Sequence, residues 1–188
     1  MRKIILHFAI TLDGITSNVE RWVSLDDEAI KDTGAYQDTL DAIIFGKNSY
    51  AGLTAYWLKA ETDSKSEAER TFAKQLNNMH KYILSRGEVD LSWKNSSLLR
   101  VKDEKEFKQT IGQLKNAPGK DIWVDAGEGT WRSFLQYDMW DALDMLVHPL
   151  VMGEGKPLLA SLSTKAPLKL VYSKTYANGV MNVRYEKV

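Results

Sequence analysis

Cysteine is absent from this sequence of 188 residues, which excludes disulfide bonds, thiolate nucleophiles and zinc sites built on cysteine. Neither sign of charge is in excess, with 25 basic and 25 acidic residues, so we expect no nucleic acid and no membrane as a partner. The N-terminal apolar run, residues 4–10, is too short for a signal segment or a membrane span. The expectation is a cytoplasmic protein of one domain, residues 1–188.

Short apolar runs alternate with helical patterns along the chain. Five runs have strand length and little alternation, as expected for strands covered on both faces: residues 4–10, 42–45, 82–84, 122–124 and 143–147. Four helices are predicted: one capped by Ser64 and Glu67, one capped by Asp103 and Glu106, one beginning near Thr130, and one within 26–40 that Gly34 interrupts. This order predicts an α/β fold with a central, mostly parallel sheet flanked by helices.

The C-terminal segment has a different pattern. Residues 168–172 and 180–185 are joined through Asn178-Gly179, a strong turn signal, and the second run alternates apolar and polar side chains. An antiparallel hairpin is therefore predicted at one side of the sheet. Six tryptophans are more than one core readily holds, and Trp57, Trp93 and Trp140 flank predicted loops. Exposed aromatic residues often mark an interface, so we expect a homodimer.

The three histidines do not have metal-ligand spacing, so no metal site is predicted. His7 lies in mid-strand and is expected to be buried with a hydrogen-bond partner. His80 is expected to cap the end of a helix. His148 is expected to pack at a strand end, with a place at the edge of a pocket as the alternative. The nucleotide-binding spacings G-x-G-x-x-G and G-x-x-x-x-G-K-[ST] and the serine-hydrolase motif G-x-S-x-G do not occur.

Small residues and hydrogen-bond donors follow three of the predicted strands, at residues 46–49, 85–87 and 125–130. The carboxyl ends of parallel strands meet at one edge of a sheet, where ligands of open α/β folds bind. Close backbone approach, free N–H groups at a helix start and a few cations suit a phosphate. The sequence therefore favours a phosphate-bearing ligand, although glycines after strands also simply make turns.

Five motifs in order resemble the reductase domain of the bacterial bifunctional riboflavin-biosynthesis deaminase/reductase, a member of the dihydrofolate reductase-like superfamily. They are Thr11-Leu12-Asp13-Gly14, Gly46-Lys47-Asn48-Ser49-Tyr50, Leu84-Ser85-Arg86, residues 121–127 (DIWVDAG) and residues 141–156 (DALDMLVHPLVMGEGK). The resemblance spans essentially the whole chain. It implies the dihydrofolate reductase-like fold, a homodimer, and an NADPH-dependent reductase acting on a ribosylaminopyrimidine- or pterin-like heterocycle.

The resemblance also implies which residues hold NADPH. Lys47, Ser49, Ser85 and Arg86 would bind the 2′-phosphate and pyrophosphate, residues 126–130 would wrap the pyrophosphate, and the start of the chain through Gly14 would cover the nicotinamide. The implied cofactor-binding residues are Ala9, Ile10, Gly14, Gly46, Lys47, Ser49, Ser85, Arg86, Ala126, Gly127, Glu128, Gly129 and Thr130.

Three departures from the family pattern keep other functions open. Ala126 replaces a glycine, so its methyl could obstruct the cofactor, and the acids Asp125 and Glu128 follow the same strand, where they would repel phosphate. These features favour a binding protein that kept the fold without catalysis. Asp27 is a weak candidate for the carboxylate with which dihydrofolate reductases hold the pterin, which leaves dihydrofolate reduction proper as a third hypothesis. No other catalytic residue is predicted.

Overall fold

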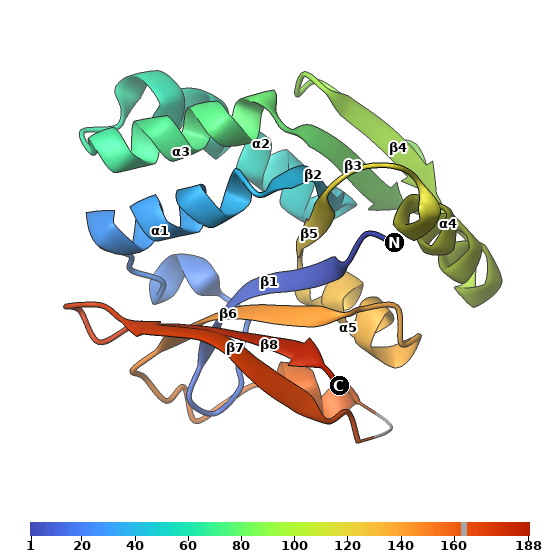
Figure 1. Ribbon diagram of the computed structural model, residues 1–188. Coiled ribbons are helices and arrows are strands. Elements are labelled where there is room, and N and C mark those ends of the chain that lie inside the picture. The colour runs from blue at the N-terminus through green and yellow to red at the C-terminus, as the bar shows by residue number, and fades with distance from the viewer. Residues whose placement is uncertain (163–164) are drawn as a thin grey trace.

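The computed structural model describes residues 1–162 and 165–188. One sheet of eight strands runs through these residues, in the order β4-β3-β2-β5-β1-β6-β8-β7 (Figure 1). The strands are β1 Ile4–Thr11, β2 Leu40–Gly46, β3 His80–Ser85, β4 Ser96–Arg100, β5 Asp121–Asp125, β6 Ala142–His148, β7 Leu168–Thr175 and β8 Met181–Lys187. The helices are α1 Asp27–Gln37, α2 Lys47–Asp63, α3 Glu67–Asn78, α4 Glu104–Asn116 and α5 Glu128–Gln136, with two short 3-10 helices, η1 Val19–Arg21 and η2 Leu158–Ser161.

The predicted fold class is confirmed. Strands β1 to β6 pair in parallel and β1 lies inside the sheet between β5 and β6, as its uniformly apolar sequence predicts. The hairpin of β7 and β8 adds antiparallel to β6, and Gly179 in its turn has a φ of +84°. All five predicted apolar runs are strands of this sheet.

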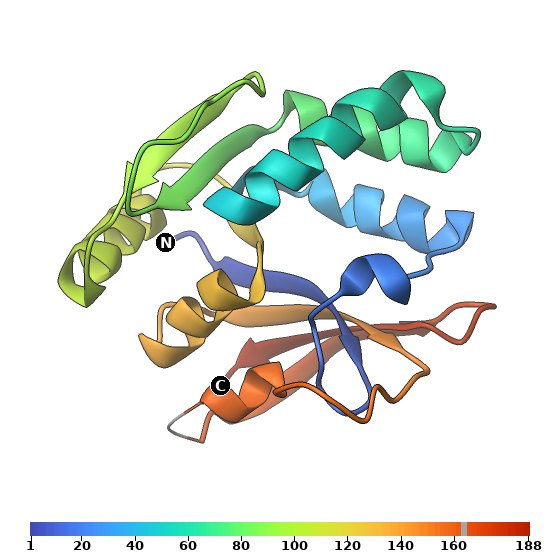
Figure 2. The same ribbon diagram turned by 180° about the vertical axis from the view of Figure 1, so that it is seen from behind.

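Helices cover both faces of the sheet, as the two views show (Figure 2). Alternate β1 residues such as Leu6 and Phe8 join α4 and α5 in one apolar cluster, while Ile5 belongs to a second cluster with α2 and α3. The stripe predicted for α5 is buried, since Trp131 and Phe134 are both in the first cluster. This layering leaves the carboxyl ends of the strands as the place where a ligand can enter between helices.

Several local predictions are wrong. The N-cap of α3 is Ser66, whose hydroxyl accepts from the Glu69 N–H at 3.1 Å, and Ser64 instead ends α2. His80 begins β3 instead of capping a helix. Gly34 does not interrupt α1; it lies where a Cβ would come within 2.9 Å of a side chain on α3, so its absence of a side chain allows the two helices to approach.

Two elements are not evident in the sequence pattern. Helix α2 has aromatic residues, Thr54 and Gly52 in its interior, which are weak helix formers, and no side chain caps its N-terminus. Its sequence therefore shows neither a clear helical period of apolar residues nor a cap signal. Strand β4 is short and half polar, at the edge of the sheet.

The expectation that tryptophans are exposed, from which a homodimer was predicted, is also wrong. Trp93 and Trp140 are each only 1% exposed, and Trp57 is half-buried against Phe72 of α3. The core therefore holds these rings, and a homodimer needs other support.

Candidate functional site

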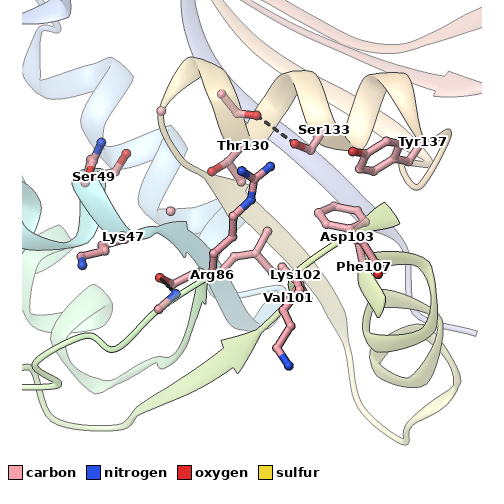
Figure 3. A pocket seen from close by; sticks show the side chains of 17 residues that line it. Lys47, Ser49, Arg86, Val101, Lys102, Asp103, Phe107, Thr130, Ser133 and Tyr137 are labelled. Atoms are coloured by element: carbon pink, nitrogen blue, oxygen red, sulfur yellow. Dashed lines mark hydrogen bonds between the residues drawn. The ribbon is translucent and has the colours of Figure 1, made fainter. Parts of the chain in front are cut away.

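A cavity of about 530 Å³ lies at the carboxyl ends of β2, β3 and β5 (Figure 3). Three chain segments that the sequence marks as phosphate-suited meet there, because parallel strands bring their carboxyl ends to one edge. Eight of the thirteen predicted cofactor residues line it: Gly46, Lys47, Ser49, Ser85, Arg86, Gly127, Gly129 and Thr130. The other five, Ala9, Ile10, Gly14, Ala126 and Glu128, do not.

The turn after β2 and the turn after β5 touch each other at the cavity. A Cβ on Gly46 would collide with Thr130 Oγ1, closer than the 3.0 Å that real Cβ atoms keep. A Cβ on Gly127 would come within 3.1 Å of Ser49 Oγ. Glycine at these two positions therefore permits the backbones of the two turns to converge on one space.

Two helices point their N-termini at the cavity without a side-chain cap. The N-caps of α2 and α5 are Gly46 and Gly127, which have no side chain to accept from the first N–H groups. The other three α-helices are capped by their own side chains, as Asp103 caps α4 by accepting from the Glu106 N–H at 2.9 Å. The free N–H groups and the helix dipoles of α2 and α5 thus favour an anion in this cavity.

Cationic side chains add to this field. Arg86 extends across the cavity toward the first turn of α5 and has no hydrogen-bond or ion-pair partner in the described part of the chain (Figure 3). Lys47 donates from Nζ to the carbonyl of Glu88 at 3.1 Å, and both side chains are exposed. Lys102 points away from the space (Figure 3). Arg86 is therefore the cation most available to a ligand here.

The far wall of the cavity was not predicted. It is made by Val101, Phe107 and Tyr137, with the rings of Phe107 and Tyr137 5.2 Å apart in an edge-to-face arrangement. Ser133 lies beside them and donates to the Gly129 carbonyl at 3.0 Å. No local pattern could reveal this wall, because α4 and α5 meet across the end of a strand, β4, that the sequence does not signal.

The two acids that the sequence places beside the expected phosphate path lie outside the cavity in the structure. Glu128 accepts from Arg132 Nε at 2.7 Å one helical turn away, and Asp125 lies half-buried beside His7, where loss of solvation raises the pKa of its carboxyl. Neither acid lines the cavity. Ala126 is also buried, as a member of the apolar cluster under α5, so its methyl does not stand in the space. The features that favoured a protein without catalysis are thus weaker than the sequence indicates.

His7 is buried with a partner, as predicted, at 8% exposed and with Nδ1 2.9 Å from Asp144 Oδ2. Burial lowers the pKa of His7, but the hydrogen bond and charge of Asp144 outweigh it, so the net shift is upward. Burial raises the pKa of Asp144, and contact with His7 and Arg184 reverses this to a net lowering. The Trp123 ring stacks on His7 at 4.2 Å. These groups form a polar row inside the sheet, away from the cavity.

The residues expected to cover a nicotinamide lie at the carboxyl end of β1. Ala9 and Ile10 pair with β6. In the loop that follows, the Asp13 carboxylate accepts from Thr11 Oγ1 at 2.5 Å and from the Gly153 N–H at 2.9 Å, and these bonds hold the loop against the segment after β6. These hydrogen bonds lower the pKa of Asp13 to about 2. This end of the sheet therefore has a fixed loop next to it.

Trp22 meets the edge of the His148 ring near that loop, with 5.2 Å between ring centroids. His148 Nε2 is buried and has no hydrogen-bond partner in the regions that the structure describes. A buried nitrogen without a partner is costly, which makes it a candidate contact for a ligand at the end of β6.

Asp27 does not face the sheet. It is exposed, and its carboxylate accepts from the Ser66 hydroxyl at 2.7 Å, while its neighbour Asp26 caps α1. The structure gives the pterin-holding role no support.

A search of the described residues finds no group of three or more His, Cys, Asp or Glu placed to hold a metal ion. In the same residues no helix is long and apolar enough to cross a membrane.

A sheet of this order, with a polar cavity at the carboxyl ends of its strands, defines the dihydrofolate reductase-like class of α/β folds. The chain belongs to the RibD C-terminal domain family, whose model matches residues 2–182.

Three known proteins are similar over nearly the whole chain. The "Uncharacterized protein YyaP" of Bacillus subtilis (strain 168) is 29% identical, over 98% of this chain and 94% of the relative. A solved protein named for riboflavin biosynthesis from Shewanella sp. PV-4 has a TM-score of 0.66 at 19% identity, covering 99% of each chain. A dihydrofolate reductase from Enterococcus faecalis, solved with NADP(H) and RAB-propyl, has a TM-score of 0.61 at 9% identity, over 98% of this chain and 96% of that one. At these identities the two structures show the fold alone.

Proposed function

We propose that this protein is an NADPH-dependent reductase of a small heterocyclic substrate. The single observation that carries the proposal is that two helix N-termini without side-chain caps converge on one cavity with Arg86, which has no partner among the described residues. An anion with several phosphate charges is the ligand that such a donor set stabilises. Family membership and the NADP(H) bound to the dihydrofolate reductase of the same fold support this reading.

The residues present fit the phosphate-bearing half of the cofactor. The N–H groups that begin α2 and α5 would hold the pyrophosphate, and Arg86, with Lys47 and Ser85, would hold the 2′-phosphate. The wall of Val101, Phe107 and Tyr137 offers an apolar surface to a planar base. Ala9, Ile10 and Gly14 would cover the nicotinamide at the end of β1.

When bound, NADPH supplies a hydride, and the chain's own contribution is to hold the two reactants in contact and to exclude water. The substrate would enter beside β1 and β6, where His148 Nε2 has no hydrogen-bond partner among the described residues and Trp22 lies against the ring. A ribosylaminopyrimidine- or pterin-like heterocycle suits this proposal, because a relative of the same fold is named for riboflavin biosynthesis. A cytoplasmic location is part of the same proposal.

A second candidate is a nucleotide-binding protein without turnover. It rests on the phosphate-suited cavity alone, since a nucleotide can bind there without a substrate beside it. Dihydrofolate reduction proper has no corresponding observation, since Asp27 faces away from the sheet.

The test is a titration of the protein with NADPH and with NADH, read by tryptophan emission. NADPH should bind more tightly. Arg86→Ala should weaken NADPH binding by about ten- to a hundredfold, since a charge-assisted contact contributes roughly 1.5–3 kcal/mol, and should leave NADH nearly unchanged. Arg100→Ala is the matched control: it removes the same charge from the end of the neighbouring strand, where Arg100 pairs with Glu88 outside the cavity.

Oxidation of bound NADPH by pterins or ribosylaminopyrimidines then separates the two candidates. Turnover establishes the reductase, whereas tight binding without oxidation by either substrate class supports the binding protein. If neither nucleotide binds at millimolar concentration, both forms of the proposal fail.

A further inference from the structure

Arg132 connects two parts of the molecule that lie on either side of α5. It is one turn into this helix, and its side chain is only 19% exposed. Its Nε donates to the Glu128 carboxylate at 2.7 Å, one turn back toward the cavity. Its terminal nitrogens donate to carbonyl groups of the segment that follows β6, to Lys156 at 3.0 Å and to Leu158 at 3.4 Å. One planar, charged group therefore holds both a carboxylate and a stretch of backbone.

Glu128 is the first residue of α5, beside the N–H groups that face the cavity. A carboxylate at this position competes with a ligand anion, because it interacts with the helix dipole itself and repels the charge of the ligand. The ion pair with Arg132 places a positive charge against Glu128 and offsets both effects. The first residue of α4, Glu104, pairs with Lys108 at the same spacing, but neither of these two residues lines the cavity.

The segment that Arg132 holds is packed against the loop after β1. The Leu158 N–H donates to the Gly14 carbonyl at 2.8 Å, and a Cβ on Gly14 would come within 3.1 Å of Pro157 Cβ. The two views show these stretches of chain side by side, with η2 next to α5 (Figures 1 and 2). The loop through Gly14 is the part expected to cover the nicotinamide. Arg132 therefore supports that loop through one intervening segment.

We propose that Arg132 is a positioning residue of the candidate site, which neutralises Glu128 beside the bound phosphates and at the same time fixes the loop that covers the rest of the ligand. Arg132 does not line the cavity, so it acts through these groups and not by contact with the ligand. A lysine at this position could supply the charge but not the fork of donors that reaches neighbouring carbonyl groups. The proposal rests on the proposed function, because it concerns the same cofactor site.

The first test measures binding of inorganic pyrophosphate by isothermal titration calorimetry, since this anion probes the N-terminus of α5 without the rest of the cofactor. Arg132→Met should weaken binding by roughly tenfold, because it leaves the charge of Glu128 unpaired beside the charges of the ligand. Adding Glu128→Gln to this variant should restore most of the affinity. Lys108→Met is the matched control, since it breaks the corresponding pair of α4 and should bind pyrophosphate like the wild type.

The second test measures hydrogen exchange of the backbone N–H groups by mass spectrometry. In Arg132→Met and in Arg132→Lys, peptides that cover residues 11–16 and 150–158 should exchange about tenfold faster than in the wild type, because the segment loses its bonds to the guanidinium. Glu128→Gln should not restore this protection, since it returns no donor to the carbonyl groups. Arg132→Lys should bind pyrophosphate more tightly than Arg132→Met, because it keeps a charge near Glu128.

Folding of each variant is checked by far-UV circular dichroism and Tm, and Arg132→Gln replaces Arg132→Met if that variant does not fold. If Arg132 only stabilised α5, Glu128→Gln would add to the loss, so failure of the double variant to recover pyrophosphate binding overturns the proposal.

Unchanged hydrogen exchange of residues 11–16 in Arg132→Met also overturns the proposal, as does a wild type that binds no pyrophosphate. A wild type that shows both effects with pyrophosphate but does not bind NADPH supports the role of Arg132 and refutes the cofactor proposal. The two proposals can therefore fail separately.

Discussion

The contact between Gly46 and Thr130 gives the sharpest test of the site's geometry. Gly46→Ala adds one methyl that would collide with Thr130 Oγ1, while the Thr130 Cβ is 3.5 Å away, an ordinary contact. The hydroxyl is on a β-branched side chain of α5, where few rotamers are open to it, so one of the two turns must shift. Overpacking of this kind costs roughly 1–3 kcal/mol.

The expected result is a Tm lower by several degrees, since about 1 kcal/mol corresponds to 2–4 °C in a chain of this size. NADPH should bind about tenfold more weakly, because both turns line the cavity. The double variant Gly46→Ala/Thr130→Ala removes the colliding oxygen and should recover most of the lost Tm. Gly52→Ala is the control, since Gly52 lies in the same helix with nothing within 4 Å of an added Cβ. The reasoning is refuted if Gly46→Ala matches the wild type in Tm, or if removing the Thr130 hydroxyl restores nothing.

Two further predictions concern buried groups. The pKa of His7 is raised in the folded state, so folding binds a proton there; stability from His7 is fully present below its unfolded pKa, near 6.5, and is lost as pH rises through the higher folded value. As pH rises above about 6.5, Tm should therefore fall more in the wild type than in His7→Gln, as calorimetry can measure, and equal slopes would contradict the role of the Asp144 pairing. Ala126→Gly should lower the free energy of unfolding by about 1 kcal/mol and leave NADPH affinity unchanged, since the methyl fills the core; tighter binding would show that it does obstruct the cofactor.

How well the sequence predicts an element depends on how far apart along the chain the interacting residues lie. The cap of α4 by Asp103 and the stripe of α5 are set by residues three or four positions apart, and the hairpin by a turn and a period of two. Helix α2 has no such pattern, because Gly46 caps it without a side chain and its interior mixes helix-weak residues. Its stability comes from packing of residues such as Tyr50 in the core, which the local sequence does not display.

The candidate site also has one part that the sequence predicts and one part that it does not. The motifs after β2, β3 and β5 predicted eight residues that do line one cavity, because parallel strands bring their carboxyl ends together whatever the loops contain. The wall of Phe107 and Tyr137 could not be predicted, since it depends on how α4 meets α5.

By itself the sequence determined the fold class, the interior place of β1, the C-terminal hairpin and the segments that surround a phosphate-suited cavity. Only the tertiary structure decided which side chains line that cavity and which are paired elsewhere. It pairs Glu128 with Arg132, turns the Ala126 methyl into the core, and leaves Arg86 unpaired in the described structure. The physical reason is that strand and cap patterns depend on chain neighbours, whereas the charge balance and exposure of a side chain depend on residues brought together from distant parts of the chain.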